Sequence, residues 1–178
     1  MPIAFNAWSA QLNNFVVEAA NFTGVEIGIL QSLREVPGFL AFTTVFVLLI
    51  LREQTFAVLS LALLGLGVAM TGFFPTEYGL YFTTVIMSIG FHYFEAVKQS
   101  LSLQWLKKEE APQILGRLIA IGSVTSLTVY SLLWFFIEIF QASFLVNFLV
   151  SGGICLGWQY LWECTSQALK KSHSRTNR

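Results

Sequence analysis

The chain has 178 residues, of which 55% are hydrophobic and 11% are charged, whereas about a quarter of the residues in soluble domains are charged. Its formal net charge is zero, so the composition supports neither a basic nucleic-acid-binding face nor an acidic tail. The two cysteines, Cys155 and Cys164, are too far apart for a CxxC motif and have no histidine close in sequence, which argues against a metal site or a disulfide framework. We therefore expect a membrane protein with no cofactor, no bound metal and no nucleic-acid partner.

The first 23 residues contain no Lys or Arg, so they lack the basic region with which a secretory signal peptide begins. Apolar residues such as Trp8 and Phe15 are mixed with polar ones such as Asn6 and Asn13. We interpret residues 1–23 as a partial first helix of a bundle. An amphipathic helix lying in the membrane interface is the alternative.

A helix needs about 20 predominantly apolar residues to cross a bilayer. Five further segments meet this requirement, and short polar links separate them: 26–51, 55–74, 78–106, 114–140 and 142–162. Helices joined by such short links run in alternating directions and pack as neighbours. The sequence therefore predicts an all-α fold, a polytopic transmembrane helical bundle with five full spans plus the partial first helix, in a single domain over residues 1–178.

The Lys and Arg residues near the span ends predict the orientation, because cytoplasmic loops are enriched in them. Basic residues occur in the links 52–54 and 107–117 and in the tail 163–178, whereas the links around Pro75 and Gln141 have none. The distribution alternates from loop to loop. We therefore expect both basic links and the C-terminal tail to be cytoplasmic, in an integral protein of a bacterial inner membrane.

The segment 78–106 carries charges inside an apolar pattern, in the stretch SIGFHYFEAVKQS from Ser88 to Ser100. A charge near the bilayer centre costs about 2.5–3.5 kcal/mol, so such residues usually face a cavity or a partner. A spacing of three or four residues places the polar residues of this segment on one helical face: Thr84, Ser88, His92, Glu95, Gln99 and Ser102. We interpret His92 and Glu95 as a proton- or substrate-binding pair with Gln99 beside them. Lys98 either forms an i, i+3 ion pair with Glu95 or extends to the cytoplasmic surface.

Arg34 and Glu35 are adjacent inside the segment 26–51. On a helix they point about 100° apart, so we expect that they do not neutralise each other and that each needs another partner. Arg34 is placed to reach an anionic substrate or Glu95, and its alternative is extension toward the outer surface. Pro37 and Gly38 weaken helix continuity, as is tolerated in transporter helices that line a cavity.

Gly122 and Ser126 lie four residues apart in the segment 114–140 and form a small-xxx-small pair, which allows two helices to approach closely. We assign both residues to helix packing. Arg117, at the start of the same segment, is interpreted as an anchor at the cytoplasmic surface.

The stretch FTGVEIGILQSLREVPGFLAF, residues 22–42, resembles the junction of helices 1 and 2 in the major facilitator superfamily (MFS). The resemblance extends over a shortened helix 1 and helices 2 to 6, which is the N-terminal half of such a transporter. It implies that helices 1, 2, 4 and 5 face a central cavity, and the charged and polar segments of this chain fall on those helices. The link LILREQTFAVL departs from the family pattern, because only Arg52 matches its Gly-x-x-x-Asp-Arg-x-Gly-Arg motif.

The resemblance implies secondary active transport by symport or antiport, in which a small-molecule solute moves by alternating access and protons are a candidate coupling ion. The expected partners are the lipid bilayer, the solute, and a second half-transporter chain or a second copy in a homodimer. A truncated or accessory non-transporting membrane subunit is the first alternative. A membrane-integral enzyme using His92 and Glu95 is the second, but the chain lacks a clustered set of catalytic groups, so we expect no enzyme activity and no catalytic residue.

Overall fold

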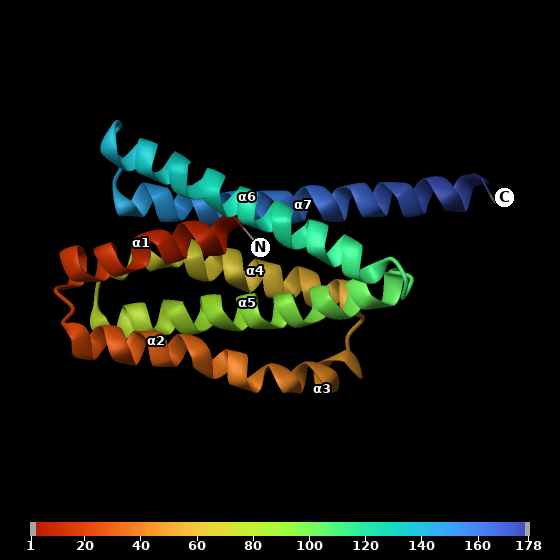
Figure 1. Cartoon of the computed structure of the whole chain (residues 1–178), viewed down its shortest axis with the longest axis horizontal. Helices are drawn as coiled ribbons and strands as arrows, with labels where there is room; N and C mark the ends of the chain where they lie inside the picture. Colours follow the sequence, from red (N-terminus) through yellow and green to blue (C-terminus); the bar gives the residue numbers. More distant parts are fainter. Residues whose placement is uncertain (1–2, 177–178) are drawn as a thin grey trace.

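The computed structural model describes the backbone of residues 3–176, and the side chains of that range except 105 and 161–176. The described chain is helical throughout and contains no strand, which confirms the all-α prediction. Its elements are α1 (Ile3–Ala20), α2 (Gly24–Phe39), the 3₁₀ helix η1 (Leu40–Thr43), α3 (Thr44–Leu48), α4 (Glu53–Thr71), α5 (Glu77–Trp105), α6 (Ala111–Glu138) and α7 (Phe144–Thr176). The helices run side by side along the long axis, and α7 extends beyond the others at one end (Figure 1). The predicted tail 163–178 thus continues α7 as far as Thr176.

The turn between α1 and α2 is specified by its local sequence. Asn21 adopts the left-handed conformation with φ 54°, which ends α1, and the Phe22 N–H donates back to the Val16 carbonyl over 3.1 Å. Thr23 then caps α2 in a capping box, because its own N–H donates to the Glu26 carboxylate over 2.8 Å. The chain therefore reverses direction within three residues and places α2 antiparallel to α1.

The predicted segment 26–51 is not one helix. It consists of α2, the 3₁₀ turn η1 and the short α3, which follow one another along one side of the molecule (Figure 1). Pro37 lies inside α2 and has no N–H to donate to the preceding turn, which weakens the helix just before the 3₁₀ turn. The interruption agrees with the expected effect of Pro37 and Gly38 but makes this segment a broken element.

The centre of the bundle is α4, which packs between α5 and α7. On one side, a Cβ at Gly67 would lie 2.5 Å from the backbone nitrogen of Met87 in α5. On another, a Cβ at Gly152 of α7 would lie 2.5 Å from the carbonyl oxygen of Gly65. Small residues of this kind allow helix backbones to approach closely, a mode of packing common in membranes. The partial first helix joins this core through Trp8, which is fully buried and donates to Thr71 over 3.1 Å.

The remaining helices lie at the edges. In the described part of the chain, α2 packs mainly on α5, and α6 packs mainly on α1. The α1–α6 contact buries Ala7 against Val129 and Leu133, while most of the other large apolar side chains of α6 are exposed. As a result α2 and α6 stand at opposite ends of the helix array.

The number of membrane spans that length and composition support is smaller than predicted. Among the described residues, α4 and α6 are long and apolar enough to cross a membrane. The segment 26–51 is interrupted, the polar face of α5 lowers its hydropathy, and only the apolar stretch Phe144–Tyr160 of α7 lies within the described side chains. The structure therefore shows two candidate spans of this type, not the five full spans expected from the sequence.

Candidate functional site

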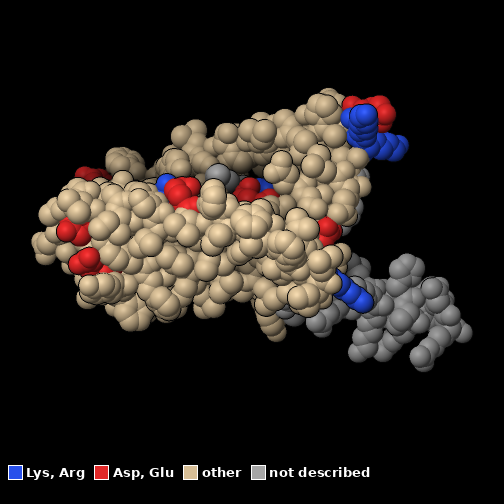
Figure 2. Space-filling view, turned by 90° about the horizontal axis from the view of Figure 1, so that it is seen from below, with Lys and Arg blue, Asp and Glu red and all other residues tan. Residues whose placement is uncertain are grey.

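A hollow about midway along the molecule contains charged atoms of both signs (Figure 2). One wall is formed by α2, where a shallow cavity of about 520 Å³ is lined by Gln31, Ser32, Glu35, Val36 and Phe39. The predicted charged residues of α5 follow His92 on the helix against which α2 packs. We call this region the polar groove and define it by Gln31, Arg34, Glu35, His92, Glu95 and Lys98.

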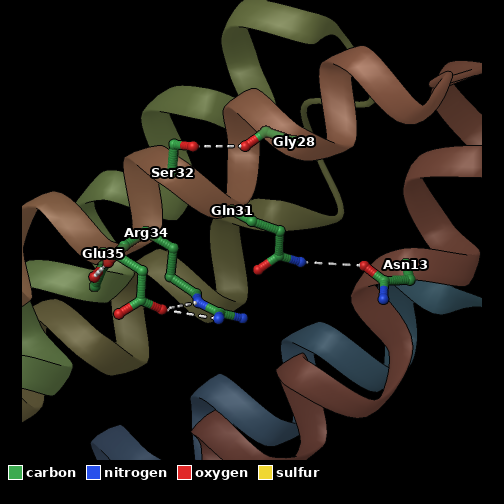
Figure 3. Close-up of polar contacts among 7 residues, drawn as sticks. Asn13, Gly28, Gln31, Ser32, Arg34 and Glu35 are labelled. Carbon is green, nitrogen blue, oxygen red and sulfur yellow. Dashed lines mark hydrogen bonds and ion pairs between the residues drawn. The ribbon is translucent and has the colours of Figure 1, made fainter.

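Arg34 and Glu35 form an ion pair with each other (Figure 3). The Glu35 carboxylate accepts from Nη2 and Nε of Arg34 over 2.8 and 3.0 Å. The prediction that the two residues cannot neutralise each other was wrong, because the long guanidinium side chain bends across the angle between adjacent helix positions. The Glu35 side chain is 61% exposed and that of Arg34 is 27% exposed, so the pair remains accessible from the groove.

His92 packs against the broken helix. A Cβ at Gly38 would lie 2.6 Å from Cε1 of the imidazole, so a larger residue there would require the ring to move. One turn away, the Ser88 hydroxyl donates to the Arg34 carbonyl close to Pro37. Along α5, His92 lies between Ser88, which contacts the Arg34 backbone, and Glu95.

Glu95 and Lys98 form the second ion pair of the groove. Lys98 Nζ lies 2.6 Å from one carboxylate oxygen of Glu95 and 2.5 Å from the other. This geometry matches the first of the two interpretations of Lys98, the i, i+3 pair. Gln99 is exposed at the next position of α5. On the same helical face, Thr84 and Ser88 are fully buried closer to the N-terminal end of α5.

Polar residues of α1 connect both edges of the groove, a role that the sequence did not reveal. Asn13 accepts from Gln31 of α2 over 3.3 Å, and Asn6 donates to Ser126 of α6 over 2.9 Å (Figure 3 for Asn13 and Gln31). Ser126 also donates to the carbonyl of Gly122 over 3.0 Å, so the small-residue pair lies at the contact of α6 with α1. The seven-residue spacing of the two asparagines, which places them on one helical face, was the available signal.

The described residues contain no group of three or more His, Cys, Asp or Glu side chains suited to a metal ion. Comparisons with protein-family models, with curated proteins and with solved structures gave no match. The groove itself, with two ion pairs on either side of an imidazole, is therefore the basis for assigning a function.

Proposed function

We propose that the chain is a membrane-embedded helical unit of a major facilitator type secondary transporter, and that its polar groove binds the transported solute. The observation that carries this proposal is the position of the charged groups. Arg34 and Glu35 form one ion pair on α2, Glu95 and Lys98 form another on α5, and the two helices pack together. A hollow of the molecule contains charged atoms of both signs (Figure 2). Charged residues inside membrane helices are expensive and usually mark a solute or ion pathway.

Two features support the assignment to a bilayer: the exposed apolar surface of α6, and the glycines that bring the backbone of α4 close to α5 and α7. The face of α6 opposite its contact with α1 exposes large apolar side chains such as Ile121, Val124 and Leu127. We further propose that α5, the broken α2–η1–α3 element and α7 also cross the membrane, giving five spans beside the shorter α1. With 29 residues, α5 is long enough to cross a bilayer, and its charged side chains would face the groove and not the lipid. The basic links would then face the cytoplasm in a bacterial inner membrane.

Transport would require a second helical unit. The groove is open along the side between α2 and α6, so a solute bound there would remain exposed until another unit covered it. In such transporters two units rock against each other around a fixed site near the middle of the bilayer. A homologous unit in a separate chain or a second copy of this chain would supply the missing wall.

Proton coupling is part of the proposal and concerns the ion pair of Glu95 with Lys98, which we call the inner ion pair. Protonation of Glu95 would remove the charge that holds Lys98, and the neighbouring His92 could receive or supply the proton. The partners of the working protein would then be lipid, solute, protons and the second unit.

The membrane position of the groove can be tested with single cysteines in a background carrying Cys155→Ala and Cys164→Ala. Val36→Cys lies in the groove, and Val124→Cys is its matched control on the outer face of α6; both valines are exposed. In sealed membrane vesicles we expect a charged, water-soluble maleimide to label the groove position and to leave the α6 position unlabelled. Equal labelling of both positions would show that α6 faces water and would contradict the membrane assignment.

Transport is tested by uptake of radiolabelled solutes into energised vesicles that contain the full chain. We expect uptake to be lost with His92→Ala and with Glu95→Gln, and to persist with Glu109→Gln, an exposed link residue that undergoes the same change of charge. Proton-coupled uptake that survives Glu95→Gln would remove the coupling role of this residue. Solute binding without uptake by the unmodified chain would rule out a working homodimer and leave the chain as one unit of a two-chain transporter or as an accessory subunit.

A further inference from the structure

We propose that the solute of the polar groove is a small zwitterion, a molecule with one carboxylate and one cationic group. This inference rests on the proposed function and adds the chemical class of the solute. Its starting point is the balance of charge in the groove. The positive charges of Arg34 and Lys98 are equal in number to the negative charges of Glu35 and Glu95. With the His92 imidazole uncharged, the groove is neutral as a whole.

The balance of charge discriminates between classes of solute because every charge in the groove already has a partner. A solute with a net charge would displace one member of an ion pair and leave that member without compensation in a region of low dielectric. A zwitterion can replace both partners at once: its carboxylate takes the place of Glu35, and its cationic group takes the place of Arg34. All charges then remain paired before and after binding.

The ion pair of Arg34 with Glu35, which we call the outer ion pair, offers the groups that such a solute needs. The Arg34 guanidinium presents a planar fork of donors suited to a carboxylate, and Glu35 presents an exposed carboxylate to an ammonium group. Beside them, Oε1 of Gln31 is buried at the edge of the groove and has no hydrogen-bond partner among the described residues. A buried acceptor without a donor is costly, and an ammonium group bound at Glu35 would supply one.

The inner ion pair provides a second position of the same kind further along the groove. Ser88, which contacts the Arg34 backbone, and Glu95 are seven residues apart on α5, which corresponds to about 10 Å along the helix. His92 lies between them and touches α2 at Gly38. A zwitterion could therefore pass from the outer pair to the inner pair without leaving an unpaired charge behind it.

The test uses sets of four solutes that share a carbon skeleton and differ only in charge. The three-carbon set is alanine (zwitterion), lactate (anion), alaninamide (cation) and lactamide (uncharged), and a six-carbon set is built in the same way on leucine. Binding to the purified full chain in detergent at pH 7 is measured as the rise in its melting temperature with solute concentration. We expect the zwitterion of at least one set to bind about tenfold or more tightly than its three analogues, since each analogue lacks one or both charge-assisted contacts.

Variants of the outer pair should shift this preference in predictable directions. Glu35→Gln leaves the groove with one excess positive charge, so the anion should become the best ligand, and Arg34→Gln should favour the cation. The double variant carrying both changes restores neutrality without the charges of Arg34 and Glu35, so the preference for the zwitterion at this position should be lost. Glu109→Gln changes the net charge of the chain equally but lies in an exposed link, so it should keep the zwitterion preference.

Several outcomes would overturn the inference. If an anion, cation or uncharged analogue binds and is transported best by the unmodified chain, the zwitterion assignment fails while the transport function stands. An unchanged preference in Glu35→Gln and Arg34→Gln would show that the outer pair does not contact the solute. Failure of every member of both sets to bind or to be taken up would count against the solute-binding function and the zwitterion assignment together.

Discussion

Two adjacent glycines of α7 have opposite surroundings and so allow a matched test of the helix packing. A Cβ at Gly152 would lie 2.5 Å from the carbonyl oxygen of Gly65 and 2.7 Å from the backbone nitrogen of Ala69, whereas a Cβ at Gly153 would have no atom within 4 Å. Since ordinary van der Waals contact begins at 3.4 Å, Gly152→Ala must separate α7 from α4 by roughly an ångström. Gly153→Ala only fills open space.

The magnitude follows from comparing the two variants with each other. Both gain the same helix propensity, about 1 kcal/mol for replacing glycine by alanine. They differ in the clash, and overpacking a well-packed interior costs about 1–3 kcal/mol. In a chain of this size 1 kcal/mol shifts Tm by about 2–4 °C, so Gly152→Ala should melt roughly 2–12 °C below Gly153→Ala.

Thermal unfolding of the purified full chain in detergent, followed by tryptophan fluorescence, measures this difference. Gly152→Leu extends the series, and its larger side chain should lower Tm further, whereas Gly153→Leu should have a small effect. Equal melting temperatures of the two alanine variants would refute the reasoning, because they would show that α4 and α7 do not approach each other at Gly152.

Three further predictions concern the helices that border the groove. Gly38→Ala should lower Tm through its clash with the His92 ring, and His92→Ala should remove most of that penalty, so a double-mutant cycle should give a coupling of about 0.5–3 kcal/mol; additive effects would contradict the contact. Ser88→Ala removes the hydroxyl that donates to α2 and should cost about 0.5–1.5 kcal/mol of unfolding free energy in a detergent titration, while no change would rule out that hydrogen bond. Asn6→Ala should release α6 at its contact with Ser126 and speed proteolysis in the link between α5 and α6, with unchanged digestion as the opposing result.

The starts of α4, α5 and α6 could be predicted because their signals are local. Each of these helices begins within a polar or proline-containing link: α4 at Glu53 within 52–54, α5 at Glu77 within 75–77, and α6 at Ala111 within 107–112. At these points the chain cannot continue an apolar helix, since proline lacks a donor and charged residues favour water. The helical class and the order of the elements followed from the same features.

The break at Leu40–Thr43 could not be predicted in detail, because its sequence LAFT is apolar and contains neither glycine nor proline. Pro37 lies several residues earlier, and where its effect ends depends on how α2 packs against Ser88 and His92. The pairing of Arg34 with Glu35 likewise depends on side-chain rotamers, which residue spacing on a helix does not determine. The sequence therefore indicated the charged residues of the polar groove and, as one of two alternatives, the Glu95–Lys98 pair, but neither Gln31 nor the pairing of Arg34 with Glu35.

The way in which each helix is held identifies the parts of the molecule that can move. Glycines bring the backbone of α4 against α5 and α7, and a backbone contact cannot be relieved by rotating a side chain. The edge helices are attached through side chains instead. Leu30 of α2 is buried in the core, and α2 also contacts the Ser88 hydroxyl and the His92 ring. Val129 and Leu133 attach α6 to α1 together with the Asn6–Ser126 hydrogen bond. Such groups exchange partners by changing rotamer, and the 3₁₀ turn gives the first of these helices a point at which to bend. The helices α2 and α6 could therefore shift toward or away from each other while α4, α5 and α7 keep their packing, which is the movement that the proposed transport by alternating access would require.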